Sequence, residues 1–579
     1  MTPGATPDAN GTTFAAWSTT ARSISVRLDG ERVVPLEALG QGRFAAHVAG
    51  VAPGALYAFL LDGEVTPDPF ARALPQGVHG PGCVVARERV EPLAAPLPTS
   101  SWVICEVHVG TFSPEGTFRG TEAKLEALAE IGINAIELLP IAAFDGQHGW
   151  GYDGVALYAP HAPYGSPEDL RSLVRAAHAR GIAVVLDVVY NHFGPAGNYL
   201  WRYAREYFDE DVKTPWGAAP AFAHPPMRSL VVENARYWLE EFGFDGLRLD
   251  ATHAIVDPSP LHVLREITDL AHALTPPRRI FFEDERNDPT VVTENGADAV
   301  WADDFHHQVH VLLTGERDGY YAAYEPSLDA LALAINEGWT FTGQPFAPWK
   351  GKPRGASLRA QGVPPGKLVY CLQNHDQVGN RALGSRLAHD VDLAAFAAAS
   401  TLLLFLPAIP LLLMGQEWAA SSPFLFFSDH HGDLGEAIRK GRREEFSAFA
   451  AFADPATRGG IPDPQSPETF QRSKLRWGER TEEPHHGMRE LHRELLALRR
   501  EDPVLAAPCA WADLHATARG NVLEVVRTHE DEERRLLVTF GAEPADVDVP
   551  PDARLLFTCG SYTRGELGAR SAVIFSLSA

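Results

Sequence analysis

The sequence predicts an α/β protein: a (β/α)8 barrel with an N-terminal β-sandwich and a small C-terminal β-domain. The first observation is that apolar strand-like runs alternate with helical segments between residues 94 and 502, which is typical of a parallel sheet covered on both faces. The second is that about eight such units can be counted, which favours a closed barrel over an open sheet. The third is that short alternating runs flank this region on both sides, which indicates antiparallel β-structure.

The N-terminal domain is expected to span residues 1–93. Its β-rich runs are separated by Gly, Asp and Pro turns, and strands at this close spacing are typical of a sandwich. The proline-rich stretch at residues 91–99 is expected to link it to the barrel. The runs lie at residues 12–18, 24–30, 43–50 and 56–63.

The barrel is expected to span residues 94–502. Its predicted strands are the apolar runs at residues 102–109, 134–140, 182–190, 246–250, 279–283, 367–373 and 409–414. Its predicted helices have apolar residues at helical spacing, and they lie at residues 122–132, 171–181, 231–243, 264–274 and 488–502. The C-terminal β-domain, residues 503–579, carries β-like runs at residues 522–529, 535–540 and 571–578.

One segment could be mistaken for a membrane helix. Residues 393–415 carry no charge, and a stretch of this length is long enough to span a bilayer. However, Pro407 and Pro410 interrupt it, and alanines fill its first half. We therefore expect a buried helix at residues 393–405, followed by a buried strand, and no membrane association.

Composition limits the possible partners. The chain has 579 residues, with 75 acidic and 50 basic side chains and a net charge of -25. This balance argues against binding to nucleic acid or anionic membranes, which needs clustered Lys and Arg. It suits a neutral substrate such as a sugar, although solubility alone also explains it.

The five cysteines are widely spaced, are odd in number and form no CxxC motif. This usage indicates a reducing cytoplasm better than a disulfide framework or a zinc site. The polar N-terminus lacks the layout of a signal peptide, so a cytoplasmic location is expected. The sequence leaves the oligomeric state open.

Charged residues follow several of the predicted barrel strands directly. Catalytic groups of a (β/α)8 barrel gather at the C-terminal ends of its strands. Any one of these residues could be a strand-end cap or part of a structural ion pair, but together they would crowd carboxylates onto one rim. Such places are Asp187 to His192, Arg248 with Asp250, Glu283, and His375 with Asp376.

Two carboxylates on one rim are the requirement for glycoside hydrolysis with retention. One attacks the anomeric carbon, and the other protonates the leaving oxygen and then activates water. The motifs DVVYNH, GLRLDATH, EDERND and QNHD, which begin at residues 187, 246, 283 and 373, resemble the four conserved regions of the α-amylase superfamily in the same order. This resemblance implies an α-glucan-cleaving barrel.

Carried over motif by motif, the resemblance implies that Asp250 is the nucleophile, Glu283 the general acid/base and Asp376 the stabiliser of the transition state. Arg248 would orient Asp250 and keep it ionised, and Asp187 would support this corner through an ion pair to Arg248. The expected substrate contacts are the aromatic platform Tyr152 and the sugar-binding His192 and His375.

Other residues have more than one interpretation. His253 could touch the leaving group or only pack, and Trp216 could form a substrate wall or anchor its loop. Asn191 matches a calcium position of many amylases, but no lid domain follows it, so no metal is expected. Asp303, Asp304, His306 and His307 resemble a metal cluster, but we expect them to shape the site near the sixth strand. Glu417 and Trp418 are expected behind the substrate contacts.

Longer segments resemble the maltooligosyltrehalose trehalohydrolases of this superfamily, at residues 283–289, 301–324, 343–355, 373–387 and 414–434. The resemblance implies hydrolysis of the α-1,4 bond next to the terminal trehalose of maltooligosyltrehalose, without a cofactor. The expected ligands are therefore maltooligosyltrehalose and maltooligosaccharides. Two alternatives stay open: a glycogen branching or debranching enzyme, and a non-catalytic glucan-binding protein that keeps the barrel.

Overall fold

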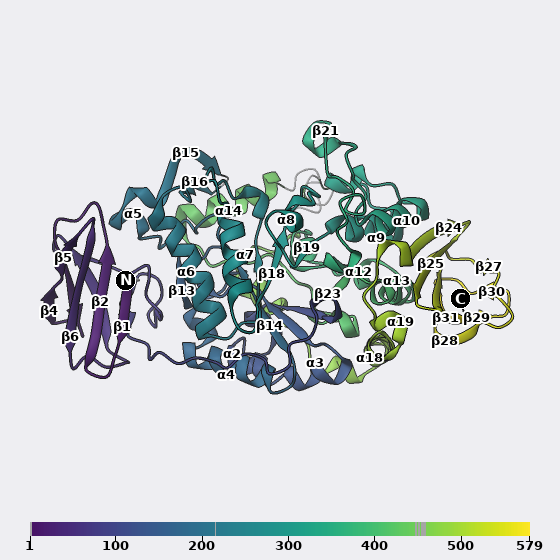
Figure 1. Cartoon of the computed structure of the whole chain (residues 1–579), viewed down its shortest axis with the longest axis horizontal. Coiled ribbons are helices and arrows are strands. Elements are labelled where there is room, and N and C mark those ends of the chain that lie inside the picture. The colour runs from purple at the N-terminus through teal and green to yellow at the C-terminus, as the bar shows by residue number, and fades with distance from the viewer. Residues whose placement is uncertain (1–2, 215, 446–448, 450–451, 453–458, 579) are drawn as a thin grey trace.

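The computed structural model describes residues 3–214, 216–445, 449, 452 and 459–578. The molecule is elongated, with a central barrel between two groups of sheets (Figure 1). The N-terminal sheets lie at one end of the long axis and the C-terminal sheets at the other. The termini are therefore far apart, and the barrel separates the two β-structures.

Eight parallel strands close into a barrel, which confirms the predicted fold class. Seven of them are predicted from the sequence; the eighth, β19, has only 3 residues and is not. In barrel order the strands are β10 (Ile104–Val107), β11 (Ala135–Leu138), β14 (Ala183–Val188), β17 (Gly246–Leu249), β18 (Arg279–Glu283), β19 (Ala299–Trp301), β22 (Leu368–Cys371) and β23 (Ile409–Leu413).

Helices cover the outside of the barrel. α4 begins with a capping box, in which the Ser166 hydroxyl accepts from the Asp169 backbone N–H and the Asp169 carboxylate accepts from the Ser166 N–H; this satisfies two otherwise free donors. Gly132 ends α3 in a left-handed conformation with φ of 99°, which glycine adopts without strain. The long predicted helices are present as α3 (Leu125–Ile131), α4 (Pro167–His178), α6 (Pro225–Glu241), α7 (Val263–Ala273), α13 (Leu393–Phe405) and α18 (His485–Glu501).

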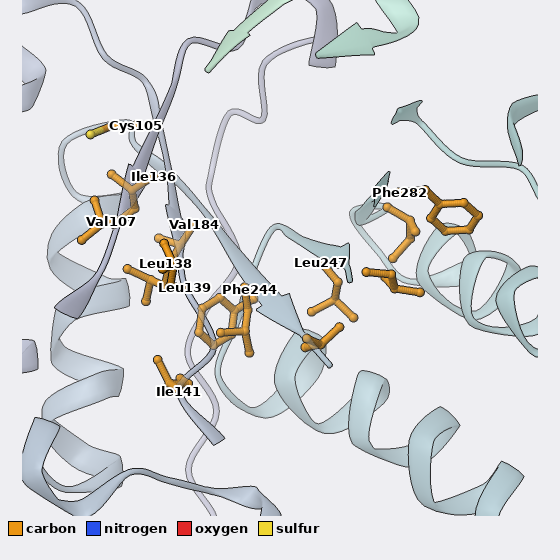
Figure 2. Close-up of a cluster of buried hydrophobic side chains, with 14 of the residues drawn as sticks. Cys105, Val107, Ile136, Leu138, Leu139, Ile141, Val184, Phe244, Leu247 and Phe282 are labelled. Atoms are coloured by element: carbon orange, nitrogen blue, oxygen red, sulfur yellow. The ribbon is translucent and has the colours of Figure 1, made fainter. Parts of the chain in front are cut away.

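Alternation along each strand divides the barrel core into two layers. Since successive side chains point to opposite faces, one set packs outward against the helices, among them Val107, Leu138 and Leu247 (Figure 2). The other set, which includes Ile104, Val185 and Phe281, forms a separate apolar cluster on the opposite face. Several side chains that point to this inner face near the C-terminal strand ends are charged, as described below.

The segment at residues 393–415 forms α13 and β23, as expected. Of the 13 residues of α13, 11 are buried, and the guanidinium of Arg499 donates to the carbonyl oxygens of Leu404 and Ala408 at 2.9 and 2.8 Å. This arginine satisfies backbone acceptors where the helix ends. Across the described part of the chain, no helix combines the length and apolar character needed to cross a membrane.

At the N-terminal end, one four-stranded sheet packs against a second sheet, with the rings of Phe14 and Tyr57 5.1 Å apart. The strands are β1 (Gly4–Pro7), β2 (Gly11–Trp17), β5 (Glu37–Gly40) and β6 (Arg43–Ala49) in the first sheet, and β3 (Ile24–Leu28), β4 (Arg32–Pro35), β7 (Leu56–Leu61), β8 (Glu64–Thr66) and β9 (Gly82–Cys83) in the second.

The C-terminal sheets contain β24 (Leu514–Arg519), β25 (Val522–His529), β26 (Glu532–Val538), β28 (Arg554–Cys559) and β31 (Ala572–Ser578), together with a smaller sheet of β27 (Ala545–Asp546), β29 (Tyr562–Thr563) and β30 (Glu566–Leu567). The division of the chain at residues 93 and 502 stays a prediction.

Candidate active site

Strand alternation brings a layer of charged side chains into the C-terminal mouth of the barrel. Glu106 pairs in register with Glu137 on the neighbouring strand, and Asp187 pairs with Arg248 on the next two strands. These four side chains point into the barrel, as do those of the inner apolar cluster, and all four are almost fully buried. The sequence places charge inside the barrel at the one end where catalytic groups of this fold gather.

Arg248 connects three carboxylates. Its Nη1 lies 2.9 Å from both oxygens of Asp187 and 2.8 Å from Asp250 Oδ1. Its Nη2 lies 3.2 Å from Glu283 Oε2. The expected Asp187–Arg248 ion pair is therefore present, and Asp250 and Glu283 contact the two ends of the same guanidinium. The Trp301 ring lies 4.5 Å from the guanidinium carbon and covers its remaining face.

Asp250 is held in the ionised form. Burial raises its pKa, but the charge of Arg248 and a hydrogen bond from Asn191 outweigh burial and hold the pKa below its usual value. Asn191 Nδ2 donates to Asp250 Oδ2 at 2.7 Å and to the Asp250 carbonyl oxygen at 2.8 Å. Asn191 thus uses its amide group to position Asp250.

Glu283 has the opposite protonation preference. Burial raises its pKa to about 8; Arg248 opposes this shift, and the carboxylates of Asp250, Asp303 and Asp376 increase it. The backbone N–H of Ala251 donates to Glu283 Oε2 at 2.7 Å. Ala251 adopts a left-handed conformation with φ of 41°, which a non-glycine residue adopts only where its surroundings enforce it. The strained turn after Asp250 thereby fixes Glu283.

Asp376 differs from these acids because it is exposed. It lies in α11 (His375–Gly379), directly after β22, and its Oδ1 accepts a hydrogen bond from Asn380 Nδ2 at 2.8 Å. Its charge is close enough to raise the pKa values of Glu283 and Asp303. The three expected catalytic carboxylates therefore lie within electrostatic reach of one another.

Tyr152 and His375 form the wall beside Asp187. Their rings stack 5.2 Å apart at an interplanar angle of 17°. The Tyr152 hydroxyl donates to Asp187 Oδ2 at 2.7 Å and lies 2.8 Å from His375 Nε2. His375 Nδ1 lies 2.6 Å from Glu106 Oε1. This chain of contacts connects the first strand of the barrel to Asp187.

His192 and Trp216 lie together on another side of the site. The indole of Trp216 stacks on the His192 ring at 4.0 Å and 10°, and Trp216 remains 49% exposed. Both ring nitrogens of His192 have protein partners, Asn191 Oδ1 and the carbonyl oxygen of Tyr152. His192 therefore positions its neighbours directly, and Trp216 presents an aromatic surface to solvent.

His253 contacts none of the three catalytic candidates through a hydrogen bond. Its Nε2 lies 3.7 Å from Glu285 Oε1, and its buried Nδ1 has no hydrogen-bond partner within the described ranges. The structure places it in a short 3-10 helix, Thr252–Ala254, immediately after Asp250. A contact with substrate stays a prediction for this residue.

Asp304 is the centre of a second polar network. Both of its oxygens accept several hydrogen bonds, from Asn287, Tyr324, Arg354 and the backbone N–H groups of residues 340 and 341, at 2.6–3.0 Å. His306 and His307 are also hydrogen-bonded, with His306 Nδ1 2.6 Å from the Leu372 carbonyl oxygen. These contacts account for three of the four residues that resembled a metal cluster, Asp304, His306 and His307. Among the residues that the structure describes, no group of three or more His, Cys, Asp and Glu side chains could hold a metal ion.

Glu417 and Trp418 follow β23 and are almost fully buried. The Trp418 indole N–H donates to Glu479 Oε1 at 3.2 Å, and burial raises the pKa of Glu417 to about 7. They contact none of the three catalytic candidates through a hydrogen bond, and their position behind the substrate contacts stays a prediction.

Glu106 and Trp301 were missed by the sequence analysis. The predicted site residues follow apolar runs, whereas Glu106 lies inside one and Trp301 ends a strand of only 3 residues. An acidic residue within the apolar run VICEVHV was the available signal, because a buried carboxylate is rare unless it is paired.

Several known proteins are similar to this chain in sequence and fold. The family model of the alpha-amylase catalytic domain matches residues 64–215. A crystal structure from Salmonella typhimurium, described as an alpha amylase, has a TM-score of 0.91 and 38% identity over 99% of both chains. The fold and the carboxylate-rich mouth of the barrel thus define a glycosidase of the alpha-amylase class.

Relatives that match most of the chain identify the family within the alpha-amylase class. The malto-oligosyltrehalose trehalohydrolase of Deinococcus radiodurans is 47% identical over 99% of this chain and 96% of its own length. The protein of the same name from Saccharolobus solfataricus is 39% identical over 82% of this chain and 84% of its own length. The chain belongs to the malto-oligosyltrehalose trehalohydrolase family.

Proposed function

We propose that the protein hydrolyses the α-1,4-glucosidic bond next to the terminal trehalose of maltooligosyltrehalose and releases trehalose. The substrate class follows the family, since several relatives carry the name of this activity. The excess of acidic over basic residues, with a net charge of -25, suits a neutral glucan better than an anionic ligand. We propose that the enzyme acts in the cytoplasm and that its chemistry uses no cofactor.

The observation that carries the proposed mechanism is the opposite protonation of two carboxylates on one guanidinium. Asp250 has a lowered pKa and Glu283 a pKa of about 8, so at neutral pH one is a nucleophile and the other holds a proton. Such a split separates the nucleophile from the general acid in retaining glycosidases. Arg248 stabilises it by contacting both groups.

In the first proposed step, Asp250 attacks the anomeric carbon while Glu283 gives its proton to the glycosidic oxygen. The bond to trehalose breaks, trehalose leaves, and the maltooligosyl group becomes an ester on Asp250. In the second step, Glu283 removes a proton from water, and the resulting attack releases Asp250. Asp376 is assigned to stabilising the positive charge of the transition state, because an exposed carboxylate at this rim can reach a bound sugar.

The other site residues are assigned to holding the glucan. Tyr152 supplies the platform for the sugar whose bond is cleaved, and His192, His375 and Trp216 surround it. Arg248 and Asp187 act from beneath through Tyr152 and Asp250, by the contacts described above. His253 is the candidate contact to the leaving trehalose.

The direct test is incubation of the purified protein with maltotriosyltrehalose, followed by chromatography of the products. We expect free trehalose together with maltotriose, and proton NMR at early times should show the α-anomer of maltotriose. Release of glucose or formation of branched products would favour another glucan-active enzyme, and no product at all would favour a glucan-binding protein.

A further inference from the structure

Glu106 and His375 form a buried pair, and the proposed mechanism assigns no role to Glu106 or to its contact with His375. Glu106 comes from β10 and is 0% exposed, and His375, which follows β22, is 3% exposed. The carboxylate contacts His375 twice: Oε2 accepts from the backbone N–H at 2.8 Å and Oε1 lies 2.6 Å from Nδ1. Two contacts from one carboxylate fix both the position and the orientation of the imidazole.

The protons of this network can be counted from its geometry. The Tyr152 hydroxyl has one proton and donates it to Asp187, which as a carboxylate only accepts. His375 Nε2, at 2.8 Å from the same hydroxyl, must therefore donate to it. Nδ1 faces the Glu106 carboxylate, which also only accepts. Both ring nitrogens carry a proton, which makes His375 an imidazolium ion.

We propose that Glu106 is a positioning residue that keeps His375 in the imidazolium form, so that His375 directs the single proton of Tyr152 onto Asp187. If His375 were neutral, its Nε2 could accept from Tyr152 instead, and the hydroxyl would have two competing acceptors. The imidazolium removes this ambiguity. It also adds a second cation, beside Arg248, to a site that contains several carboxylates.

Electrostatics supports this assignment. Burial lowers the pKa of His375, but the charge and hydrogen bond of Glu106 outweigh burial and raise the pKa to about 9. The same cation helps to lower the pKa of Asp187, which burial raises to about 6. The titratable and charged groups that face His375 from the surrounding elements are Glu106, His108, Glu137, Tyr152, Asp187, Arg248 and Asp376.

The replacement Glu106→Gln tests the proposal. A neutral amide has one acceptor oxygen, so it can satisfy only one of the two His375 N–H groups. Since burial then acts without the opposing charge of Glu106, the His375 pKa should fall to its usual value of about 6.5 or below. Because His375 would then lose its proton before Glu283 does, the alkaline limb of kcat/KM should move from about pH 8 to about pH 6.5 or below. At pH 8 we expect a loss of about tenfold or more, by the one-unit-per-tenfold relation.

A matched control is Glu137→Gln. Glu137 is the register neighbour of Glu106 on β11, and burial raises its pKa well above the usual value. Burial thus favours the neutral form of this side chain, and the same substitution should shift the alkaline limb less than Glu106→Gln does. Glu106→Asp, which keeps the charge, should return the limb part of the way towards pH 8.

A purely structural role for Glu106 predicts a different result: a lower rate at every pH with an unmoved alkaline limb. That result would overturn the proposal. If Glu106→Gln does not fold, nitrogen-15 NMR of histidine-labelled native protein decides, with the His375 signal identified by its loss in His375→Asn. We expect imidazolium shifts up to about pH 9, and a neutral ring at pH 7 would overturn the proposal.

The effect on turnover rests on the proposed function, but the NMR titration needs no substrate. If the native protein releases no trehalose while His375 titrates near pH 9, the proposed function fails and the assignment of Glu106 stands. If trehalose is released and His375 is neutral at pH 7, the assignment of Glu106 fails alone.

Discussion

Two buried arginines at the mouth of the barrel organise their surroundings in opposite ways. Arg248 contacts three carboxylates, and its Nε is buried without a hydrogen-bond partner within the described ranges. Arg354 pairs with one carboxylate, Asp304, whose two oxygens are satisfied by further donors. Charge and hydrogen bonds are balanced around Arg354, whereas the Arg248 site holds more acid than its cation neutralises.

The difference separates a site built for chemistry from one built for stability. Crowded carboxylates raise one another's pKa values and cost stability, so a chain keeps them where the reaction requires a protonated and an ionised acid side by side. A saturated buried ion pair has no free oxygen to offer a substrate. We therefore expect substitutions around Arg248 to affect turnover, and substitutions around Arg354 to affect folding.

The largest effect is expected for Asp250→Ala. Loss of a nucleophile should lower kcat by several orders of magnitude, ~10⁴ or more, as measured by trehalose release. Thermal unfolding should change little, since the substitution also removes one of three acids from Arg248. Near-normal turnover would show that another group attacks the sugar. The acids around Arg248 would then not include the nucleophile.

Glu283→Gln is expected to lower kcat by about 10²–10⁴, the usual contribution of a general acid. In the native enzyme, kcat/KM should fall as the pH rises through about 8, because Glu283 then loses the proton that it must donate. The variant should lose this part of the pH dependence. A native profile that stays flat to pH 9 would contradict the role of Glu283 as the acid.

The raised pKa of Glu283 also makes the stability of the folded protein depend on pH. Its pKa is higher in the folded protein than in the unfolded chain, so the folded state binds more protons between about pH 4.5 and 8, and stability falls as the pH rises through this window. Replacement by Gln should raise the free energy of unfolding at pH 7 by about 3 kcal/mol, at about 1.4 kcal/mol for each pH unit above 4.5. Denaturant unfolding at pH 5 and pH 7 measures this, and a destabilised variant would contradict it.

Asp304→Asn should lower stability and leave turnover nearly unchanged, which is the reverse of the effect expected for Glu283→Gln. It leaves the buried guanidinium of Arg354 without a counter-charge, and breaking one partner of a buried ion pair costs about 3–5 kcal/mol. The melting temperature should fall clearly, while trehalose release per folded molecule at low temperature should stay within a few fold. Loss of turnover without loss of stability would assign Asp304 to the chemistry.

Much of the fold followed from local patterns. The helix at residues 393–405 has the same bounds in the structure, because its uncharged sequence is almost entirely buried and competing interactions are few. β19 was missed because a strand of 3 residues has too little periodicity to detect. Asp250 and Glu283 are predicted as site residues because each directly follows an apolar run.

What the sequence could not supply was the long-range partners of each group. Asp304 accepts hydrogen bonds from the backbone N–H groups of residues 340 and 341, and the sequence near Asp304 does not indicate these donors. Glu106 was overlooked because its partner, His375, lies 269 residues away. Protonation states depend on such partners, so the sequence indicated the acids while the structure indicated which one keeps its proton.

The smallest effect is expected for Trp216→Ala. Trp216 stacks on His192 and remains 49% exposed, so it can lie against a sugar without being part of the core. Loss of such a platform is worth about 0.5–1.5 kcal/mol, which corresponds to a KM increase of up to about tenfold with kcat nearly unchanged. The matched control is Trp201→Ala, since Trp201 is 37% exposed and stacks on Phe208 instead. An equal rise in KM for both variants would mean that Trp216 supports its loop and does not bind substrate. Trp216 would then have a structural role, as the contacts around Arg354 do.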